Sequence, residues 1–473
     1  TGSRLFWTFL TLGFLGMSTD VLAHAVAQGD RGYIQEITGI NLISFIYLGA
    51  KHMVTGYDHL LFLLGVIFFL YRMQHIAIYV SLFALGHSTT ISYLLAAARA
   101  VFDATGLLPH ANPGVVTRAE LLALREVFFS GPYLRLAKPH DGLILDMHCH
   151  VAGIGAGDSG CFVSKELRNN FRFKIYLKAF GVTVAEAEVQ GDQLLMERLA
   201  KGIGESQRVG AAIVLAMDGA VDANGQLDRS RTEFYIPNEF VAAETAKYPN
   251  LYFGASINPH RPDALERLQW AKDNGALLLK WLPSIQFIDP ADKAHEPFYR
   301  KMVALDLPLL THAGQERSFT HARDELADPV RLKLPLSLGV KVIVAHAAST
   351  GKNEGQEDID RLIGMLGDYP NLYSDISSMT QGNKLGYLRQ AITEERLGGR
   401  LLYGSDFPLI NTAVVSPWFY PLNLTRKQMQ SIGAIGNPWD RDVALKEALG
   451  VPADVMGRSA AFFGVPLGQA AAD

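Results

Sequence analysis

From residue 143 onward, short apolar runs alternate with longer stretches in which apolar residues recur every three or four positions. The short runs are typical of buried strands, and the spacing in 194–207 and 262–274 is typical of helices that pack one face against a core. Eight strands that alternate with helices over about the length of one barrel predict an α/β fold, a (β/α)8 TIM barrel, over 142–466. The eight runs are 143–151, 211–217, 251–257, 276–283, 307–313, 341–347, 372–376 and 401–407.

The first residues of the chain have the layout of a secretory signal. Arg4 precedes the apolar run 5–17, which is too short to span a bilayer, and small residues follow around His24. We therefore expect 1–25 to be a signal-peptide-like segment, with an uncleaved first anchor as the alternative.

A second apolar region predicts an N-terminal hydrophobic helical membrane segment over 41–100. Its stretch 76–98 has no Asp, Glu, Lys or Arg and is long enough, at roughly 20 residues per span, to cross a membrane. The earlier stretch 41–71 is interrupted by ionisable residues, and Asp58 is costly in hydrocarbon unless it is paired or functional. The segment 101–141, rich in Gly, Pro and charge, is interpreted as the linker to the barrel.

Two motifs in the membrane segment resemble a known family. The runs KHMVTGYDHLLFLLG, at 51–65, and SLFALGHSTT, at 81–90, resemble the HupE/UreJ family of hydrogenase- and urease-accessory membrane proteins. The resemblance covers roughly 42–91 and implies a membrane protein that handles nickel or another metal. Members of the family carry several more spans, so a residual membrane anchor is the alternative to a role in transport.

The side of the membrane is indicated only by a few basic residues. Arg4 and Arg72 would be cytoplasmic if 76–98 runs outward, which would leave the barrel in the periplasm. Arg99 favours the opposite orientation. We expect a membrane location, with the periplasmic side slightly favoured.

Six side chains that can take part in a metal site lie at or just past the ends of the barrel's apolar runs. His148 and His150 are two apart on one predicted strand, so they should point to the same face, and Cys149 between them should point away. In a barrel the carboxyl ends of the strands meet at one face, where active sites lie. Neutral imidazoles and carboxylates suit zinc. The sequence therefore predicts a divalent metal site formed by His148, His150, Lys280, His312, His346 and Asp406.

The order of these residues resembles that of the amidohydrolase superfamily, in the branch called amidohydrolase family 2. It runs His-Xaa-His on the first strand, Lys on the fourth, His on the fifth and sixth and Asp on the eighth, and the resemblance covers most of 143–465. It implies a metal-activated hydroxide that cleaves an amide, ester or lactone bond, with Asp406 moving the proton. The implied ligands are His148, His150 and Asp406 for the more buried metal and His312 and His346 for the more exposed one, bridged by Lys280 if it is carboxylated.

Two alternatives remain open. If Lys280 is unmodified, His148, His150, His312 and Asp406 would hold a single metal, and His346 would be a catalytic acid or base, as in relatives that are decarboxylases or hydratases. The chain could also be a metal-handling membrane accessory protein that carries the barrel as a passenger.

The loops after the strands are expected to contact a small-molecule substrate. The loop after the fifth strand offers Gln315, Arg317 and His321 as candidate substrate-binding residues. The long excursion 152–193 after the first strand contains several aromatic residues that favour burial, and it is interpreted as a lid or specificity loop.

Charge and cysteine content narrow the function further. The 473 residues have a formal net charge of −4, which gives no global field that would favour nucleic acid. The two cysteines are too few for a disulfide framework or a zinc-thiolate site. Oligomerisation stays open.

Overall fold

The computed structural model describes residues 140–467, except 317, 318, 320 and 321. The predicted signal-like and membrane segments, and nearly all of the predicted linker, lie outside the described residues. Within the described part of the chain, no helix combines the length and the apolarity that a membrane span requires.

Eight parallel strands form the centre of the described structure. Two bridges, between Cys149 and Phe407 and between Ala255 and Leu279, join the edges of a three-stranded and a five-stranded sheet, so the sheet closes into a barrel. This confirms the predicted α/β barrel, and each of the eight predicted runs overlaps one strand, although the second strand begins at Val209, two residues before its run. In spatial order the strands are β1 (Ile144–His150), β3 (Val209–Leu215), β5 (Leu251–Gly254), β6 (Leu279–Trp281), β7 (Leu309–Thr311), β8 (Val342–Val344), β11 (Leu372–Asp375) and β12 (Leu401–Leu402).

The strands separate two apolar layers because their side chains alternate between faces. On β3, Ala211 and Ile213 join an interior cluster, whereas Ala212 and Val214 pack in the outer cluster beneath the helices. The interior cluster also receives Leu145, Met147, Leu310, Ile343 and Leu402 from other strands, and Leu278 from the position just before β6. Cys149 belongs to the outer cluster.

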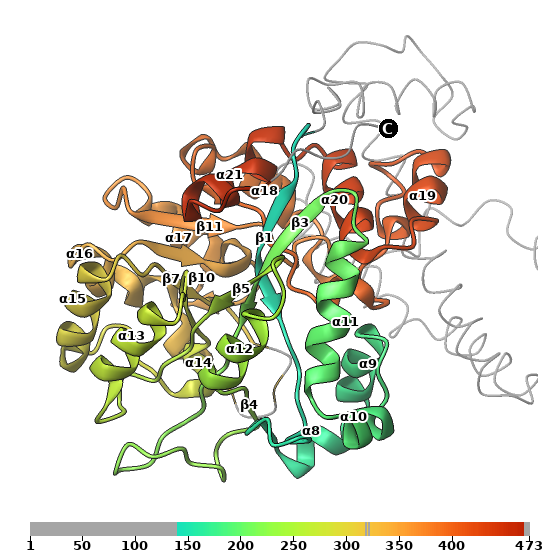
Figure 1. Cartoon of the computed structure of the whole chain (residues 1–473). Coiled ribbons are helices and arrows are strands. Elements are labelled where there is room, and N and C mark those ends of the chain that lie inside the picture. Colours follow the sequence, from blue (N-terminus) through green and yellow to red (C-terminus); the bar gives the residue numbers. More distant parts are fainter. Residues whose placement is uncertain (1–139, 317–318, 320–321, 468–473) are drawn as a thin grey trace, which may run out of the picture. The chain divides into compact units, whose positions relative to one another are not determined.

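Helices cover the outside of the barrel, and α11 and α12 lie beside β3 and β5 (Figure 1). The helix α11 forms where its apolar residues recur at helical spacing, and it buries six of them on one face. The helices between and after the strands are α11 (Gln193–Gly204), α12 (Asn238–Thr245), α13 (Ala264–Asp273), α14 (Pro283–Gln286), α15 (Glu296–Ala304), α16 (Lys333–Ser337), α17 (Asp358–Met365), α18 (Tyr387–Thr393), α19 (Arg426–Gly433), α20 (Pro438–Ala448) and α21 (Ala453–Phe463).

The long excursion after β1 is folded into helices. It contains α8 (Lys165–Asn169), α9 (Phe171–Ala179) and α10 (Val184–Gln190), and its short strand β2 (Phe162–Val163) pairs with β4 (Phe234–Tyr235). At its base, the buried carboxylate of Asp192 accepts hydrogen bonds from the backbone of Ile154 and Gly155 and from the Ser159 hydroxyl. Phe173, Leu177 and Phe180 are buried, as their apolar character predicted.

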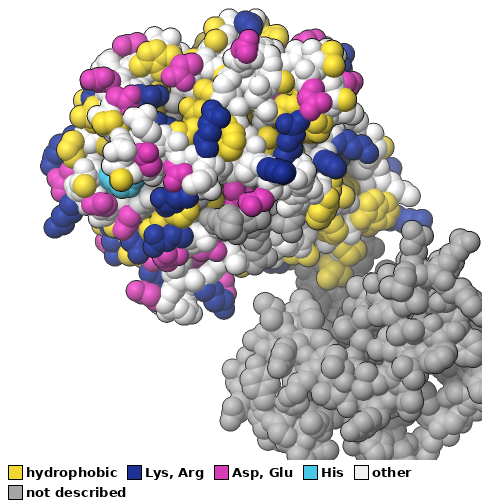
Figure 2. Space-filling model, turned by 90° about the horizontal axis from the view of Figure 1, so that it is seen from below, with side chains coloured by type: hydrophobic (Ala, Val, Ile, Leu, Met, Phe, Trp, Pro, Cys, Tyr) yellow, Lys and Arg dark blue, Asp and Glu magenta, His cyan; other side chains and the backbone are white. Residues whose placement is uncertain are grey.

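Some apolar side chains of the excursion nevertheless remain at the surface. On α9, Phe171 is 67% exposed and Ile175 44% exposed. Figure 2 shows one face of the molecule, on which basic and acidic side chains are interspersed and apolar side chains gather toward one side.

Candidate active site

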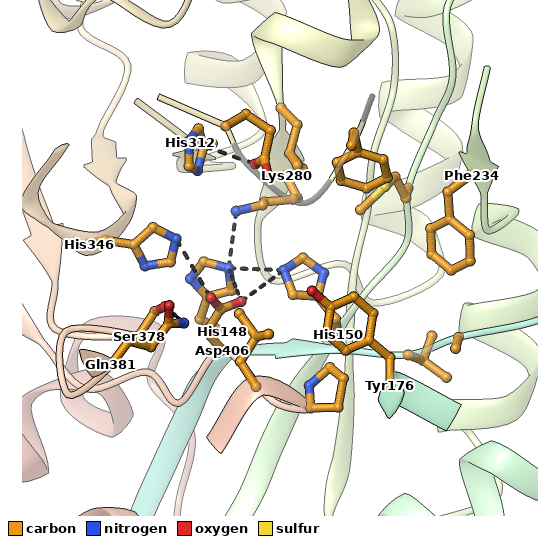
Figure 3. A pocket seen from close by; sticks show the side chains of 18 of the residues that line it. His148, His150, Tyr176, Phe234, Lys280, His312, His346, Ser378, Gln381 and Asp406 are labelled. Atoms are coloured by element: carbon orange, nitrogen blue, oxygen red, sulfur yellow. Dashed lines mark hydrogen bonds and ion pairs between the residues drawn. The ribbon is translucent and has the colours of Figure 1, made fainter. Parts of the chain in front are cut away.

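His148, His150 and Asp406 bring three potential ligand atoms together at the carboxyl ends of β1 and β12 (Figure 3). The Nε2 atoms of the two histidines are 3.2 Å apart, and Oδ1 of Asp406 lies 3.3 Å from Nε2 of His150 and 3.7 Å from Nε2 of His148. The pairing of β1 with β3 shifts register between Asp146 and Cys149, in the stretch that contains His148. Three atoms of this type at such spacing fit one divalent cation.

The backbone of Asp406 is held in an unusual conformation. Its φ of 61° lies in the left-handed region that non-glycine residues rarely adopt. Its N–H donates to the carbonyl of His148 at 2.8 Å, which connects the segment after β12 to β1. Such conformations persist where the surrounding structure enforces them, and they cluster at functional sites.

Asp375, at the end of β11, supports both His148 and His346. Its Oδ2 is 2.8 Å from Nδ1 of His148, and its Oδ1 accepts the backbone N–H of His346 at 2.8 Å. Because a carboxylate accepts the Nδ1 proton, Nε2 of His148 keeps its lone pair for a metal. Although burial acts in the opposite direction, His148 and His346 hold the pKa of Asp375 well below its usual value. Asp375 was not among the predicted site residues, although it lies one position before the end of the seventh apolar run, as His312, His346 and Asp406 do in theirs.

Asp146 lies buried beneath the candidate ligands and was also missed. Its carboxylate accepts hydrogen bonds from the backbone N–H of His148, the N–H and hydroxyl of Ser405, and the indole N–H of Trp439, at 2.5–3.1 Å. The ring of Trp439, on α20, stacks on Phe407 with centroids 4.5 Å apart. Asp146 therefore ties β1 to the segment after β12 that carries Asp406.

His346 follows β8 and faces Asp406 across the site. Its Nε2 is 3.8 Å from Oδ2 of Asp406, and its Nδ1 lies 2.9 Å from the carbonyl oxygen of Ser377. A proton on Nδ1 donated to that carbonyl leaves Nε2 able to bind a metal or accept a proton. Like Asp406, His346 has a left-handed backbone, with φ 56°.

His312 and Lys280 complete the predicted set, on the other side of the cluster. Nε2 of His312 is buried and makes no hydrogen bond within the described residues, although Oε2 of Glu316 is 3.7 Å away. Nζ of Lys280 lies 3.1 Å from Nε2 of His148, and the side chain is 1% exposed. All six predicted metal-site residues are thus gathered at one face of the barrel.

The protonation states of these groups suit a cation. Burial, with the charge of Lys280, lowers the pKa of His148 to about 4, so this imidazole is neutral at pH 7. Burial lowers the pKa of Lys280 to about 8, so part of this amine is uncharged near neutral pH. Although burial opposes them, His150, His346 and His148 keep the pKa of Asp406 well below its usual value. Neutral imidazoles and an ionised carboxylate at this spacing together fit a divalent cation.

A cavity of about 170 Å³ opens above this cluster. Gln315, one of the predicted substrate-binding residues, lines it, whereas Arg317 and His321 lie outside the described residues. The excursion after β1 contributes the aromatic side chains of Phe173, Tyr176 and Phe180 to the wall. The polar residues of the wall include Glu316, Ser378, Gln381, Asn383 and Lys384.

A comparison with protein-family models identifies the class of the barrel. The model described as Amidohydrolase matches residues 145–449, which is more than half of the chain. The chain therefore belongs to the amidohydrolase family, which confirms the predicted resemblance. Residues 28–104 match the model described as HupE / UreJ protein, which confirms the second resemblance.

Several solved structures resemble the barrel at low sequence identity. A proposed 2-pyrone-4,6-dicarboxylic acid hydrolase from Pseudomonas putida is 14% identical, with a TM-score of 0.43, over 69% of this chain and 99% of its own. The 5-carboxyvanillate decarboxylase from Sphingomonas paucimobilis is 16% identical, with a TM-score of 0.37, over 66% of this chain and 98% of its own. The 4-oxalomesaconate hydratase from Rhodopseudomonas palustris is 16% identical, with a TM-score of 0.36, over 65% of this chain and 98% of its own. No curated protein sequence matches the chain significantly.

Proposed function

We propose that this chain is a metal-dependent hydrolase that cleaves an amide, ester or lactone bond of a small molecule. The observation that carries the proposal is the convergence of His148, His150 and Asp406, whose ligand atoms lie 3.2–3.7 Å apart beneath a cavity. The proposed cofactor is zinc, which when bound supplies a water of lowered pKa and polarises a carbonyl oxygen.

The chain's own residues would then hold the cation and move protons. Oδ1 of Asp406 faces the two histidines, so Oδ2, 3.8 Å from Nε2 of His346, remains to accept a proton and return it to the leaving group. His346 is the second proposed catalytic residue, because its ring is oriented by Ser377 and its Nε2 faces Asp406. The apolar wall from the excursion would limit the access of bulk water.

Lys280 decides between one and two metal ions. Its partly neutral amine can react with carbon dioxide, forming an N–C bond and releasing a proton, and the resulting carbamate would offer two oxygens to two cations. His312 and His346 would hold the second ion, and within the described residues Nε2 of His312 has no hydrogen-bond partner that would compete.

A second candidate function is a mononuclear decarboxylase or hydratase on the same barrel. In this scheme His148, His150, His312 and Asp406 would hold one ion, and the observation that favours it is that three of these four already form a group close enough for a single ion within the described residues. His312, the fourth, lies beside Glu316, and its ring centroid is 5.6 Å from that of His346. Lys280 would then stay unmodified and His346 would act as acid or base.

The test is to measure the metal content of the full-length protein, prepared with zinc and bicarbonate, together with turnover of panels of amides, esters, lactones and aromatic acids. Two ions per chain and hydrolysis would support the first proposal. One ion with loss of carbon dioxide or addition of water would support the second. A protein that binds no metal would contradict both.

The N-terminal match supports association with the membrane. Because members of the HupE/UreJ family are membrane proteins, we infer that residues 28–104 attach the enzyme to a bilayer. The periplasmic side and the alternative of a metal-handling accessory protein remain predictions.

A further inference from the structure

The outer face of α9 combines exposed apolar and basic side chains. Phe171 and Ile175 are exposed, and so are Lys174 and Lys178 on the same helix. These four positions have the spacing i, i+3, i+4 and i+7, so they lie on one face of the helix. The opposite face lines the active-site cavity with aromatic side chains. The helix therefore separates the cavity from a surface that is both apolar and basic.

The segment after β12 presents a second surface of the same kind. Trp418 is 52% exposed and Leu422 70% exposed, and Phe419 between them is also exposed. Arg426 and Lys427, exposed at the start of α19, add positive charge beside them. The beginning of this segment lines the active-site cavity, as the inner face of α9 does.

Contacts join the two surfaces beside the cavity. The side-chain amide of Asn411 donates to the carbonyl of Ala179, at the end of α9, at 2.8 Å. The ring of Phe180 packs edge-on against that of Phe407, with centroids 4.9 Å apart. On the face seen in Figure 2, apolar side chains gather toward the side on which α9 lies in Figure 1, with basic side chains among them. We call the exposed face of α9 and the segment 418–427 together the apolar rim.

The apolar rim lies in two stretches of the sequence that contain no acidic residue. No Asp or Glu occurs in 167–185 or in 407–439. On the neighbouring helix α10, Glu188 pairs with Arg168. Glu186 caps the same helix through Thr183. Exposed aromatic and aliphatic side chains together with lysine and arginine are typical of surfaces that lie in the headgroup layer of an anionic membrane.

A membrane is also the partner that the rest of the chain supports. Residues 28–104 match a family of membrane proteins, and residues 105–139 connect them to the described barrel. A tether of this kind raises the effective concentration of the barrel at the bilayer, so a weakly binding surface is enough for docking. Exposed apolar patches edged by polar residues mark interaction sites in soluble domains.

We propose that the apolar rim docks on the headgroup layer of an anionic bilayer, so that the active-site cavity opens toward the lipid. Phe171, Trp418 and Leu422 would enter the layer, while the lysines contact phosphate groups. This rests on the proposed attachment of residues 28–104 to a membrane, and it adds the face of the barrel that meets the lipid. It does not depend on which reaction the cavity catalyses.

The test places one fluorescent probe at a time on the full-length protein in nanodiscs. Because Cys149 and Cys161 are buried, an environment-sensitive dye labels the new cysteine of Phe171→Cys or Leu422→Cys selectively. The nanodiscs contain phosphatidylglycerol or only phosphatidylcholine, each with or without a doxyl-labelled lipid that quenches the dye on contact. We expect blue-shifted emission and quenching of both probes in the anionic nanodiscs, and weaker effects in the neutral ones.

Leu265→Cys and Val303→Cys are the matched controls. These side chains are 43% and 44% exposed, similar to Ile175 on the rim. They belong to α13 and α15, which lie on the other side of the barrel from α9 (Figure 1). Dyes at these positions should stay unquenched in both kinds of nanodisc. Thermal unfolding shows that each labelled variant is folded.

The role of charge is tested by Lys174→Gln and Lys178→Gln in the protein labelled at position 422. A lysine near an anionic surface contributes about fivefold to the docking equilibrium, so each variant should lower the quenched fraction accordingly. Salt at about 1 M, which shortens the screening length to about 3 Å, should weaken docking further. Lys333→Gln, an exposed change on α16, serves as the control and should leave the quenching unchanged.

Equal quenching at rim and control positions, or none at either, would overturn the proposal. So would rim probes that neither the doxyl lipid nor aqueous iodide can quench, since residues 1–139 or a second copy of the chain would then cover the rim. Unchanged quenching in both lysine variants would overturn the choice of an anionic surface.

The proposed membrane attachment can fail separately. A protein that does not enter nanodiscs would contradict that attachment, and the same probes are then measured with anionic vesicles added to the protein. Quenching of the rim probes alone would retain the docking surface, whereas its absence would overturn it as well. No turnover is measured, so the outcome is independent of the proposed hydrolase.

Discussion

The two sides of the candidate metal site differ in how firmly their side chains are held. His148 and Asp406 belong to a side in which Asp375 and Asp146 anchor ring nitrogens and backbone groups through short hydrogen bonds. On the other side, Nε2 of His312 has no hydrogen-bond partner within the described residues, and Lys280 contacts His148 itself. The first side is preorganised for one cation, whereas the second depends on the chemical state of a lysine.

The largest expected effect comes from removing a ligand on the preorganised side. His148→Ala removes Nε2, the atom that lies closest to both His150 and Lys280. We expect abolished turnover and a loss of zinc affinity greater than the 10–100-fold that second-shell changes typically cost. Competition with a chelator measures the affinity, and circular dichroism should show an intact barrel. Unchanged activity would contradict the metal-dependent mechanism.

A smaller effect is expected from the residue that supports two of the candidate ligands. Asp375→Asn keeps the shape of the side chain but removes the charge that orients the Nδ1 proton of His148. Zinc affinity should fall by about 10–100-fold, as is typical for partners of metal-bound histidines. Asp368→Asn, an exposed change after the neighbouring helix, serves as the control. If Asp375→Asn and Asp368→Asn bound zinc equally tightly, Asp375 would not be what holds this side of the site, and the difference between the two sides would disappear.

Lys280 tests the less firmly held side. Lys280→Met should keep one zinc ion and lose the second, and added bicarbonate should no longer change the metal content. In the wild-type protein, bicarbonate should promote the second ion increasingly as the pH rises through about 8, where the amine becomes neutral. Metal analysis across this pH range measures both effects. Identical stoichiometry in wild type and variant would favour the mononuclear scheme.

The same lysine also predicts how the stability of the metal-free protein depends on pH. Its pKa falls from 10.5 in the unfolded chain to about 8 when folded, so between these values the unfolded state binds more protons. The free energy of unfolding should therefore rise with pH across this window, and Lys280→Met should remove that contribution. Denaturant unfolding at several pH values measures the slope, and an equal slope in the variant would contradict the assignment.

The smallest effects concern the network beneath the ligands. Asp146→Asn should cost about 1–3 kcal/mol of unfolding free energy, because it replaces an acceptor of four hydrogen bonds by an amide with only one oxygen. Trp439→Phe keeps an aromatic ring against Phe407 and removes one donor, so it should cost about 1 kcal/mol beyond any loss of packing. Equal losses of unfolding free energy in the two variants would mean that packing, and not the Asp146 carboxylate, holds β1 to the segment after β12.

The sequence alone determined the strands and most of the candidate ligands. Alternation and helical spacing are local properties, so eight apolar runs and the chemistry at their ends could be read directly. The spacing of His148 and His150 fixed their common direction, and applying the same rule to the seventh run would have included Asp375. The closure of the barrel then explains why these strand ends converge.

Only the tertiary structure decided which side chains support the site and what surrounds it. Asp146 bonds to Ser405 and Trp439, which lie 259 and 293 positions away, and no local pattern connects residues so far apart. A second cavity, lined by Gln315, Thr350 and Asn383 among others, likewise arises where loops after β7, β8 and β11 meet. Loop conformations depend on contacts between distant segments, so the sequence identified the chemistry of the site, while the folded chain alone placed its supports and its second cavity.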